Sequence, residues 1–219
     1  MAILEALDQT LAPVSGSASV SPEIFIRCLK KFYSHWNTSD LWGSSSAIAV
    51  ATPPPSENIR YQKSLALSTW FFGREFADTI MVFLSRQIHF LSRQEGSKLL
   101  EPLRMPVSKA LGLDIVLHNL EGDNGSALMD KILHTIFANS GSNSLIIGHI
   151  AREKPEGKIL EEWSQKLHGS RLKLYDVSAG LSELAVKDVR DYVCEKGCIF
   201  NCISHEEVCS SKPGEDYSA

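Results

Sequence analysis

The sequence has little that would direct it to a membrane or to bare DNA. No apolar run in its 219 residues approaches the roughly 20 residues that a helix needs to cross a bilayer. Residues 1–20 have neither a basic start nor a long apolar stretch, so they do not resemble a secretory signal. Acidic residues outnumber basic ones by 26 to 22, which leaves no broad basic field for DNA phosphates. We therefore expect no membrane association and no strong direct DNA binding.

Recognisable catalytic motifs are absent as well. The sequence contains no G-x-S-x-G nucleophile elbow, no H-E-x-x-H zinc motif and no Walker A loop. The glycine-containing stretch 121–126 lacks the lysine and spacing of a phosphate-binding loop, and its two acids would repel phosphate. His89 and His149 lie in or beside predicted strands and are interpreted as hydrogen-bonded residues rather than ligands, and Asp78 as a turn acid rather than a base. The prediction is a protein that is not an enzyme, with no catalytic, cofactor-binding or metal-binding residues.

One possible metal site lies near the C-terminus. Five cysteines without a secretory signal indicate reduced thiols, as in the cytosol or nucleus. The candidate zinc ligands are Cys194, Cys198, Cys202, His205 and Cys209. They lack the paired C-x2-C knuckles of common zinc sites, and on a helix the first three would stack on one face instead of surrounding an ion. Free thiols in a poorly ordered tail are therefore the favoured interpretation.

Hydrophobic periodicity predicts alternating helices and strands. The first predicted helix starts at Ser21-Pro22-Glu23, and its buried stripe consists of Phe25, Cys28, Leu29, Phe32 and Trp36. Further helices are predicted at 64–73, 96–103, 128–137 and 160–169. The predicted strands are 47–51, 79–84, 88–91, 113–118, 145–148 and 172–177, with an antiparallel hairpin turning at 85–87. This order predicts an α/β domain of three layers, in which helices flank a mixed, mostly parallel sheet.

Local signals predict where some of these helices begin and end. Ser21 and Ser64 are expected to cap helix N-termini, and Gly73 to end the second helix. Pro106 is expected to limit any extension of the helix near 96–103.

The four tryptophans are predicted to divide between core and surface. Trp36, Trp70 and Trp163 fall on the apolar stripes of predicted helices and are expected in the core. Trp42 lies in a predicted loop and is the one expected to be exposed.

Several long strings resemble one protein family. They are 61–91 (YQKSLALSTWFFGREFADTIMVFLSRQIHFL), Phe32–Asn37, Asp40–Ser44, Ala49–Pro54, Gly148–Glu153 and Pro155–Lys158. From about Phe25 to Asp188 the chain resembles the amino-terminal domain of the large subunit of FACT, a histone chaperone complex, in its plant form. That resemblance implies a creatinase-type amino-terminal lobe, which is peptidase-like in architecture but without catalytic activity.

The resemblance also implies an organisation and a function. Residues 1–20 are expected to form a flexible arm, 21–187 the lobe, and 188–219 a divergent cysteine-containing tail. The implied protein is a truncated histone- or peptide-binding lobe of a nuclear, chromosomal complex that reorganises nucleosomes in transcription, replication and DNA repair. Its implied partners are core histones and an HMG-box small subunit, and the resemblance assigns no histone-contact residue.

Two alternatives remain open at this point. One is the amino-terminal lobe of a creatinase- or proline-peptidase-like metallopeptidase, and the other is an inactive fragment. In such peptidases the metal ligands lie in a second lobe, so the first alternative requires residues beyond this sequence.

Overall fold

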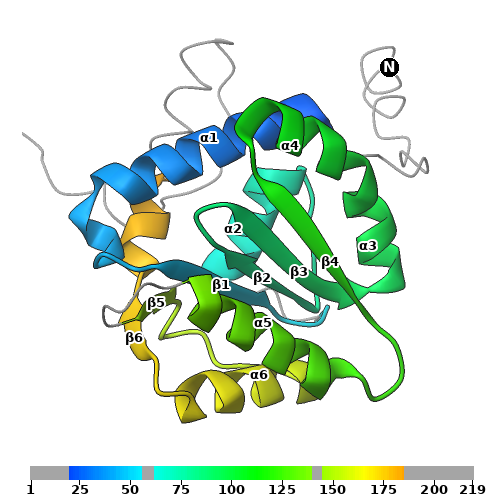
Figure 1. The fold of residues 1–219 in the computed structure, drawn as a ribbon, viewed down its shortest axis with the longest axis vertical. Coiled ribbons are helices and arrows are strands. Elements are labelled where there is room, and N and C mark those ends of the chain that lie inside the picture. The colour runs from blue at the N-terminus through cyan, green and yellow to red at the C-terminus, as the bar shows by residue number, and fades with distance from the viewer. Residues whose placement is uncertain (1–19, 56–61, 140–144, 185–219) are drawn as a thin grey trace, which may run out of the picture. The chain divides into compact units, whose positions relative to one another are not determined.

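The computed structural model describes residues 20–55, 62–139 and 145–184, which form a three-layer α/β domain (Figure 1). Six strands form one sheet in the order β4-β3-β2-β1-β5-β6. The strands are β1 (Ala47–Thr52), β2 (Thr79–Phe83), β3 (Gln87–Arg93), β4 (Asp114–Leu120), β5 (Ile146–His149) and β6 (Lys173–Asp176). The helices are α1 (Pro22–Thr38), α2 (Lys63–Phe72), α3 (Gln94–Leu100), α4 (Arg104–Leu111), α5 (Gly125–Asn139) and α6 (Lys158–Gly169), with 3-10 turns η1 (Asp40–Trp42) and η2 (Glu101–Leu103).

The sheet is mixed and mostly parallel, as predicted. β1 pairs in parallel with β5, β5 with β6, and β3 with β4, whereas β2 is antiparallel to both of its neighbours, β1 and β3. The predicted hairpin between β2 and β3 is confirmed by the Leu84 N–H, which donates to the Gln87 carbonyl at 2.8 Å. All strands except β2 therefore end at the same edge of the sheet.

Two hydrophobic clusters fill the space between the three layers. Alternate strand residues such as Val50 and Phe83 pack with α1, α2 and α4 on one face. Their neighbours along the strands, such as Ala49 and Val82, pack with α5 and α6 on the other face. Because side chains alternate across a strand, the near-continuous apolar sequences of β1 and β2 reflect burial on both faces.

An aromatic cluster holds α1 to the sheet. The predicted stripe of α1 is confirmed at Phe25, Cys28, Leu29 and Phe32. The Ser21 Oγ accepts the Ile24 N–H at 3.4 Å as the N-cap of this helix. Phe32 packs against Phe83 with ring centroids 4.7 Å apart. The Tyr33 hydroxyl donates to the Leu84 carbonyl at 2.7 Å, and this burial raises the pKa of Tyr33.

Trp42 is buried, so the prediction that it is exposed was wrong. The turn η1 folds back on α1 and places the indole against Phe32, with no exposed surface. Its Nε1–H donates to Nδ1 of His35 at 3.0 Å. Trp163 is buried as predicted, whereas Trp36 and Trp70 are only partly buried and pack against the edge of the core.

Three further local predictions were wrong. Ser64 lies inside α2, which begins at Lys63, although Gly73 ends that helix as predicted, with φ +69°. Pro106 does not stop the helical segment, because it is the third residue of α4, where no intrahelical partner exists for its missing N–H. Phe137 was expected on the apolar stripe of the helix at 128–137, but it is 43% exposed, since Ile136 already occupies the buried position of the last turn of α5.

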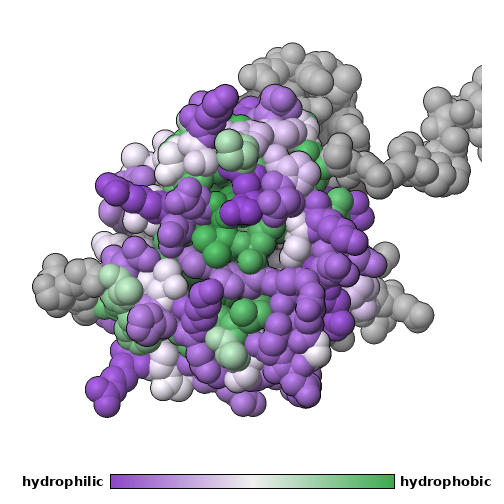
Figure 2. Space-filling model, turned by 45° about the vertical axis from the view of Figure 1, so that its right-hand side comes forward, coloured by the Kyte–Doolittle hydropathy of each residue, from purple (hydrophilic) through white to green (hydrophobic). Residues whose placement is uncertain are grey.

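Hydrophilic side chains dominate the face shown in Figure 2, where they surround small groups of hydrophobic ones. The large hydrophobic residues that are most exposed come from four separate elements: Ile24, Met105, Phe137 and Tyr175. Scattered residues of this kind are normal for a folded surface and do not require a partner. Within the described ranges, none of the helices has both the length and the apolar character needed to cross a bilayer.

Candidate functional site

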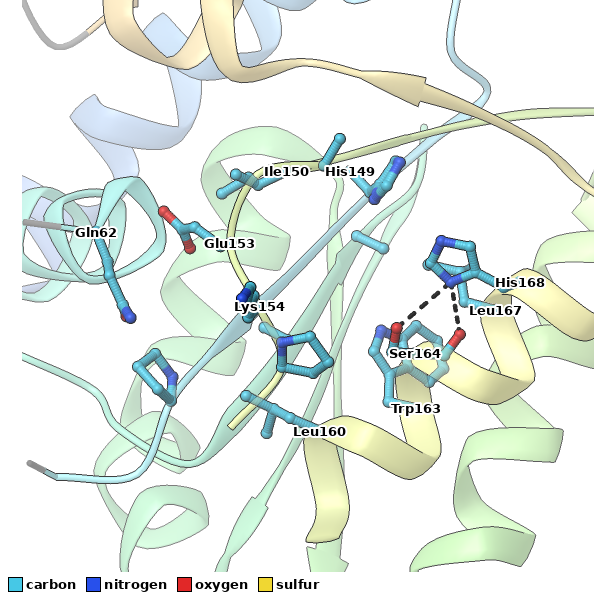
Figure 3. A pocket seen from close by; sticks show the side chains of 15 residues that line it. Gln62, His149, Ile150, Glu153, Lys154, Leu160, Trp163, Ser164, Leu167 and His168 are labelled. Carbon is cyan, nitrogen blue, oxygen red and sulfur yellow. Dashed lines mark hydrogen bonds between the residues drawn. The ribbon is translucent and has the colours of Figure 1, made fainter. Parts of the chain in front are cut away.

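A cavity of about 200 Å³ opens where β1 and β5 end. It lies between the start of α2, which packs on one face of the sheet, and α6, which packs on the other (Figure 3). In open α/β sheets, ligands bind beyond the carboxyl ends of parallel strands, at the point where successive helices change face. The position of this cavity is therefore the usual one for a binding site in this class of fold.

The wall of the cavity is apolar, and polar groups stand around it. The apolar lining consists of Ala49, Ala51, Pro53, Ile150, Ala151, Pro155, Leu160, Trp163 and Leu167. The polar lining consists of Gln62, His149, Glu153, Lys154, Ser164 and His168 (Figure 3). An apolar pocket with a few convergent polar groups is typical of small-molecule and peptide sites.

Glu153 connects the loop after β5 to the start of α2. Its carboxylate accepts the backbone N–H of Lys63 and, at 3.2 Å, that of Ser64. The N-cap residue Gln62 makes no side-chain capping bond, so this carboxylate from 90 residues away takes the role that Ser64 was predicted to have. The negative charge also complements the helix dipole, and the bond fixes one wall of the cavity.

Two imidazoles, His149 and His168, meet at the other end of the cavity. Their ring centroids are 5.8 Å apart and the planes are nearly perpendicular. Nδ1 of His168 lies 2.8 Å from the Ser164 carbonyl, so it donates there and leaves Nε2 as an acceptor when the ring is neutral. Burial lowers the pKa of His149, and His168 lowers it further, whereas Asp176 raises it. His149 is therefore uncharged at neutral pH.

The other predicted candidate residues have structural roles. Asp78 adopts φ +50° in the turn before β2 and accepts a bond from Nε of Arg93 at 2.9 Å, as expected for a turn acid. The stretch 121–126 forms a turn that leads into α5, and the Asn124 side chain accepts the Glu121 N–H at 3.0 Å.

The five candidate zinc ligands near the C-terminus lie outside the described residues. Among those described, no group of three or more His, Cys, Asp or Glu is placed to hold a metal ion.

His89 forms a buried pair with His118 under α5. Nδ1 of His89 lies 2.9 Å from Nε2 of His118, and the rings are stacked. Burial lowers the pKa of His89 to about 4, with further contributions from His118 and Lys131, and burial also lowers the pKa of His118. The pair is a hydrogen-bonded element of the core, in agreement with the sequence interpretation of His89.

We predict that this pair makes the domain sensitive to acid. An unfolded histidine has a pKa near 6.5, whereas His89 in the folded domain has one of about 4. Its neutral form therefore stabilises the fold fully above about pH 6.5, and this contribution is lost as the pH falls toward about 4. Urea unfolding at several pH values should show a shallower acid loss in His89→Gln than in the wild type. His134→Gln, which changes an exposed histidine of α5, is the control, and equal slopes in all three proteins would contradict the prediction.

Sequence reasoning missed the polar groups of the cavity: Gln62, Glu153, Lys154, Ser164 and His168. The strings 61–91, Gly148–Glu153 and Pro155–Lys158 cover part of this region, but they served for family resemblance, and His149 was interpreted only as a hydrogen-bonded residue. The residues come from three separate parts of the chain, and no short motif joins them. Only the fold brings them together.

Comparison with known proteins gives the family. A family model for the FACT complex subunit SPT16 N-terminal lobe domain matches residues 20–180. The chain is 50% identical over 186 residues to the FACT complex subunit SPT16 of Zea mays, covering 83% of this chain and 18% of that protein. It is 45% identical over 184 residues to the Arabidopsis thaliana protein, covering 80% of this chain and 17% of that one.

A solved structure shows the same fold. The chain resembles the N-terminal domain of FACT complex subunit SPT16 from Cicer arietinum (chickpea) with a TM-score of 0.70 and 46% identity, covering 76% of this chain and 38% of that one. The chain thus spans less than a fifth of the length of the curated plant relatives it matches. The predicted resemblance and fold class are confirmed: this chain belongs to the family of FACT complex subunit SPT16 N-terminal lobe domains.

Proposed function

We propose that this chain is a histone- and peptide-binding lobe of the FACT chromatin complex. The complex would act in the nucleus, on chromosomes, as a histone chaperone that reorganises nucleosomes during transcription, replication and DNA repair. The observation that carries the proposal is the match of residues 20–180 to the SPT16 N-terminal lobe family, supported by the similarity to the chickpea domain. Core histones would contact the lobe, and the HMG-box small subunit would bind other parts of the family protein.

The proposal includes the organisation of the chain. Residues 21–187 would form the lobe, 1–20 a flexible arm, and 188–219 a divergent cysteine-containing tail. Deleting the tail should then leave the stability of the lobe nearly unchanged.

We propose further that the lobe has no peptidase activity. The nearest approach to a nucleophile and base in the cavity is Ser164 with His168, whose Oγ and Nδ1 are 3.4 Å apart. That nitrogen already donates to the Ser164 carbonyl at 2.8 Å, so it is not available to take the hydroxyl proton. A proline-peptide hydrolysis assay of wild type and Ser164→Ala tests this, and turnover that disappears in the variant would overturn it.

We predict weak histone binding by the isolated chain. Linking several binding modules raises their overall affinity by roughly 10²–10⁴-fold through effective concentration, and a single lobe lacks this increase. The net charge of −4 attracts basic histones only modestly and is screened by salt. Titration of labelled core histones at physiological salt should give a micromolar or weaker Kd, and the chain alone should not disrupt nucleosomes.

Two outcomes would contradict this account of the function. Nanomolar affinity, or disruption of nucleosomes without partner subunits, would show that the lobe has activity of its own beyond a single binding module. Complete absence of binding to all core histones would favour the inactive-fragment alternative.

A further inference from the structure

Gln62 lines the cavity and carries an unpaired hydrogen-bond acceptor. Its Oε1 is fully buried and has no hydrogen-bond partner among the described residues. Gln62 immediately precedes α2, yet its side chain makes no capping bond to that helix. An unsatisfied buried acceptor costs about 1–3 kcal/mol, so folding alone gives no reason to keep it.

A second acceptor stands at the opposite side of the cavity. Nε2 of His168 accepts a hydrogen bond when the ring is neutral, because Nδ1 donates to the Ser164 carbonyl. Figure 3 shows Gln62 and His168 on opposite sides, with Leu160 and Trp163 between them. Two hydrogen-bond acceptors thus flank an apolar hollow.

We propose that this cavity binds an extended peptide segment, taking one of its apolar side chains into the hollow. On binding, the Gln62 side chain turns so that Oε1, which is buried in the free chain, accepts one backbone N–H of the peptide, and His168 Nε2 accepts another. The apolar side chain packs on Leu160 and Trp163. This inference rests on the proposed function and names the place where the lobe would bind a histone segment.

The size and charge of the cavity disfavour other ligands. Its volume of about 200 Å³ is below the roughly 300–1,000 Å³ of sites for drug-sized ligands and cofactors but suits one aliphatic side chain. A phosphate group would meet the carboxylate of Glu153, with Lys154 as the one lining cation among the described residues. A metal ion would find only two imidazoles, whereas zinc sites have three or four protein ligands, and no group of three or more His, Cys, Asp or Glu among the described residues is placed to hold one.

Two substitutions test the site in different ways. Ser164→Phe fills the cavity from α6, and Gln62→Leu removes the amide at nearly constant size. Gln165 is exposed on α6 and does not line the cavity, so Gln165→Phe and Gln165→Leu are matched controls. The probes are an acetylated, amidated alanine peptide with a central leucine, the same peptide with a central aspartate, and overlapping peptides that cover the core histones.

Binding of each peptide to the full chain is followed by amide shifts in NMR spectra and by tryptophan fluorescence. The leucine peptide and a subset of histone peptides should shift amides in 149–168, and the aspartate peptide should not. Ser164→Phe should weaken binding at least tenfold. Gln62→Leu should weaken it about three- to tenfold, as expected for one hydrogen bond, without lowering the melting temperature. Both Gln165 controls should bind like the wild type.

The outcomes separate this inference from the proposed function. If intact histones bind and Ser164→Phe and Gln62→Leu have no effect, the cavity is not the site, although the proposed function stands. If the leucine peptide binds at the cavity but no histone or histone peptide does, the site stands and the proposed function fails. A lower melting temperature in Gln62→Leu with unchanged peptide affinity would show a structural amide and overturn the inference. Should Ser164→Phe fail to fold, Gln62→Leu with its control decides.

Discussion

Replacing Trp42 by alanine should lower the free energy of unfolding by about 3–5 kcal/mol, the usual cost of truncating a fully buried tryptophan. The indole packs edge-on against Phe32 with ring centroids 5.4 Å apart, and the variant also leaves Nδ1 of His35 without its donor. A domain of this size is typically stable by about 5–15 kcal/mol, so much of the total would be lost. Chemical denaturation followed by circular dichroism measures the change.

Trp70→Ala is the comparison for this prediction. Trp70 is also a helix-borne aromatic, but it is only partly buried at the edge of the same cluster. Its truncation should therefore cost clearly less than that of Trp42. Equal losses in the two variants, or a nearly neutral Trp42→Ala, would show that η1 does not anchor α1 as described.

Gly148→Ala should be the second most damaging single change considered, with a loss of about 1–3 kcal/mol or more. A Cβ at this position in β5 would lie 2.5 Å from Cγ1 of Val177 and 2.6 Å from Cδ1 of Ile48. Both neighbours are fully buried, so neither has room to move away. The glycine permits the close approach between β1, β5 and the segment after β6.

Gly169→Ala is the matched control. Gly169 ends α6 and has no positive φ, and a Cβ there would meet no neighbouring atom of the described residues within 4 Å. Alanine at that position should be neutral or slightly stabilising, because it restricts the unfolded chain. Thermal melts of the two variants should differ by several degrees, and similar melting temperatures would contradict the packing described around Gly148.

Local patterns in the sequence were enough to predict most of the fold. The stripe Phe25, Leu29 and Phe32 has helical spacing, and the apolar run 79–84 is a strand buried on both faces, so short-range periodicity indicates each element. Parallel pairing followed from the alternation of strands and helices. Some of the strings that carried the family resemblance are structural: in Phe32–Asn37, for example, Phe32 fills the core and the Trp36 Nε1–H donates to the Ser45 carbonyl at 3.1 Å.

Contacts between distant segments account for the rest. Trp42 is buried because η1 folds back on α1, and nothing near it in the sequence indicates that direction. Glu153 caps α2 from 90 residues away, whereas local sequence signals indicated Ser64 as the cap. The cavity escaped prediction for the same reason, since Gln62 and His168 lie more than 100 positions apart in the sequence.

Hydrogen–deuterium exchange of the full chain, with and without core histones, tests the central claim most directly. The claim is that this lobe binds histone segments at the edge where β1 and β5 end. Bound histones should slow amide exchange in 149–155 and in α6, while the edge strand β4, on the far side of the sheet order, serves as an internal reference. Histone binding that protects only other segments, or no protection at any histone concentration tested, would contradict the account.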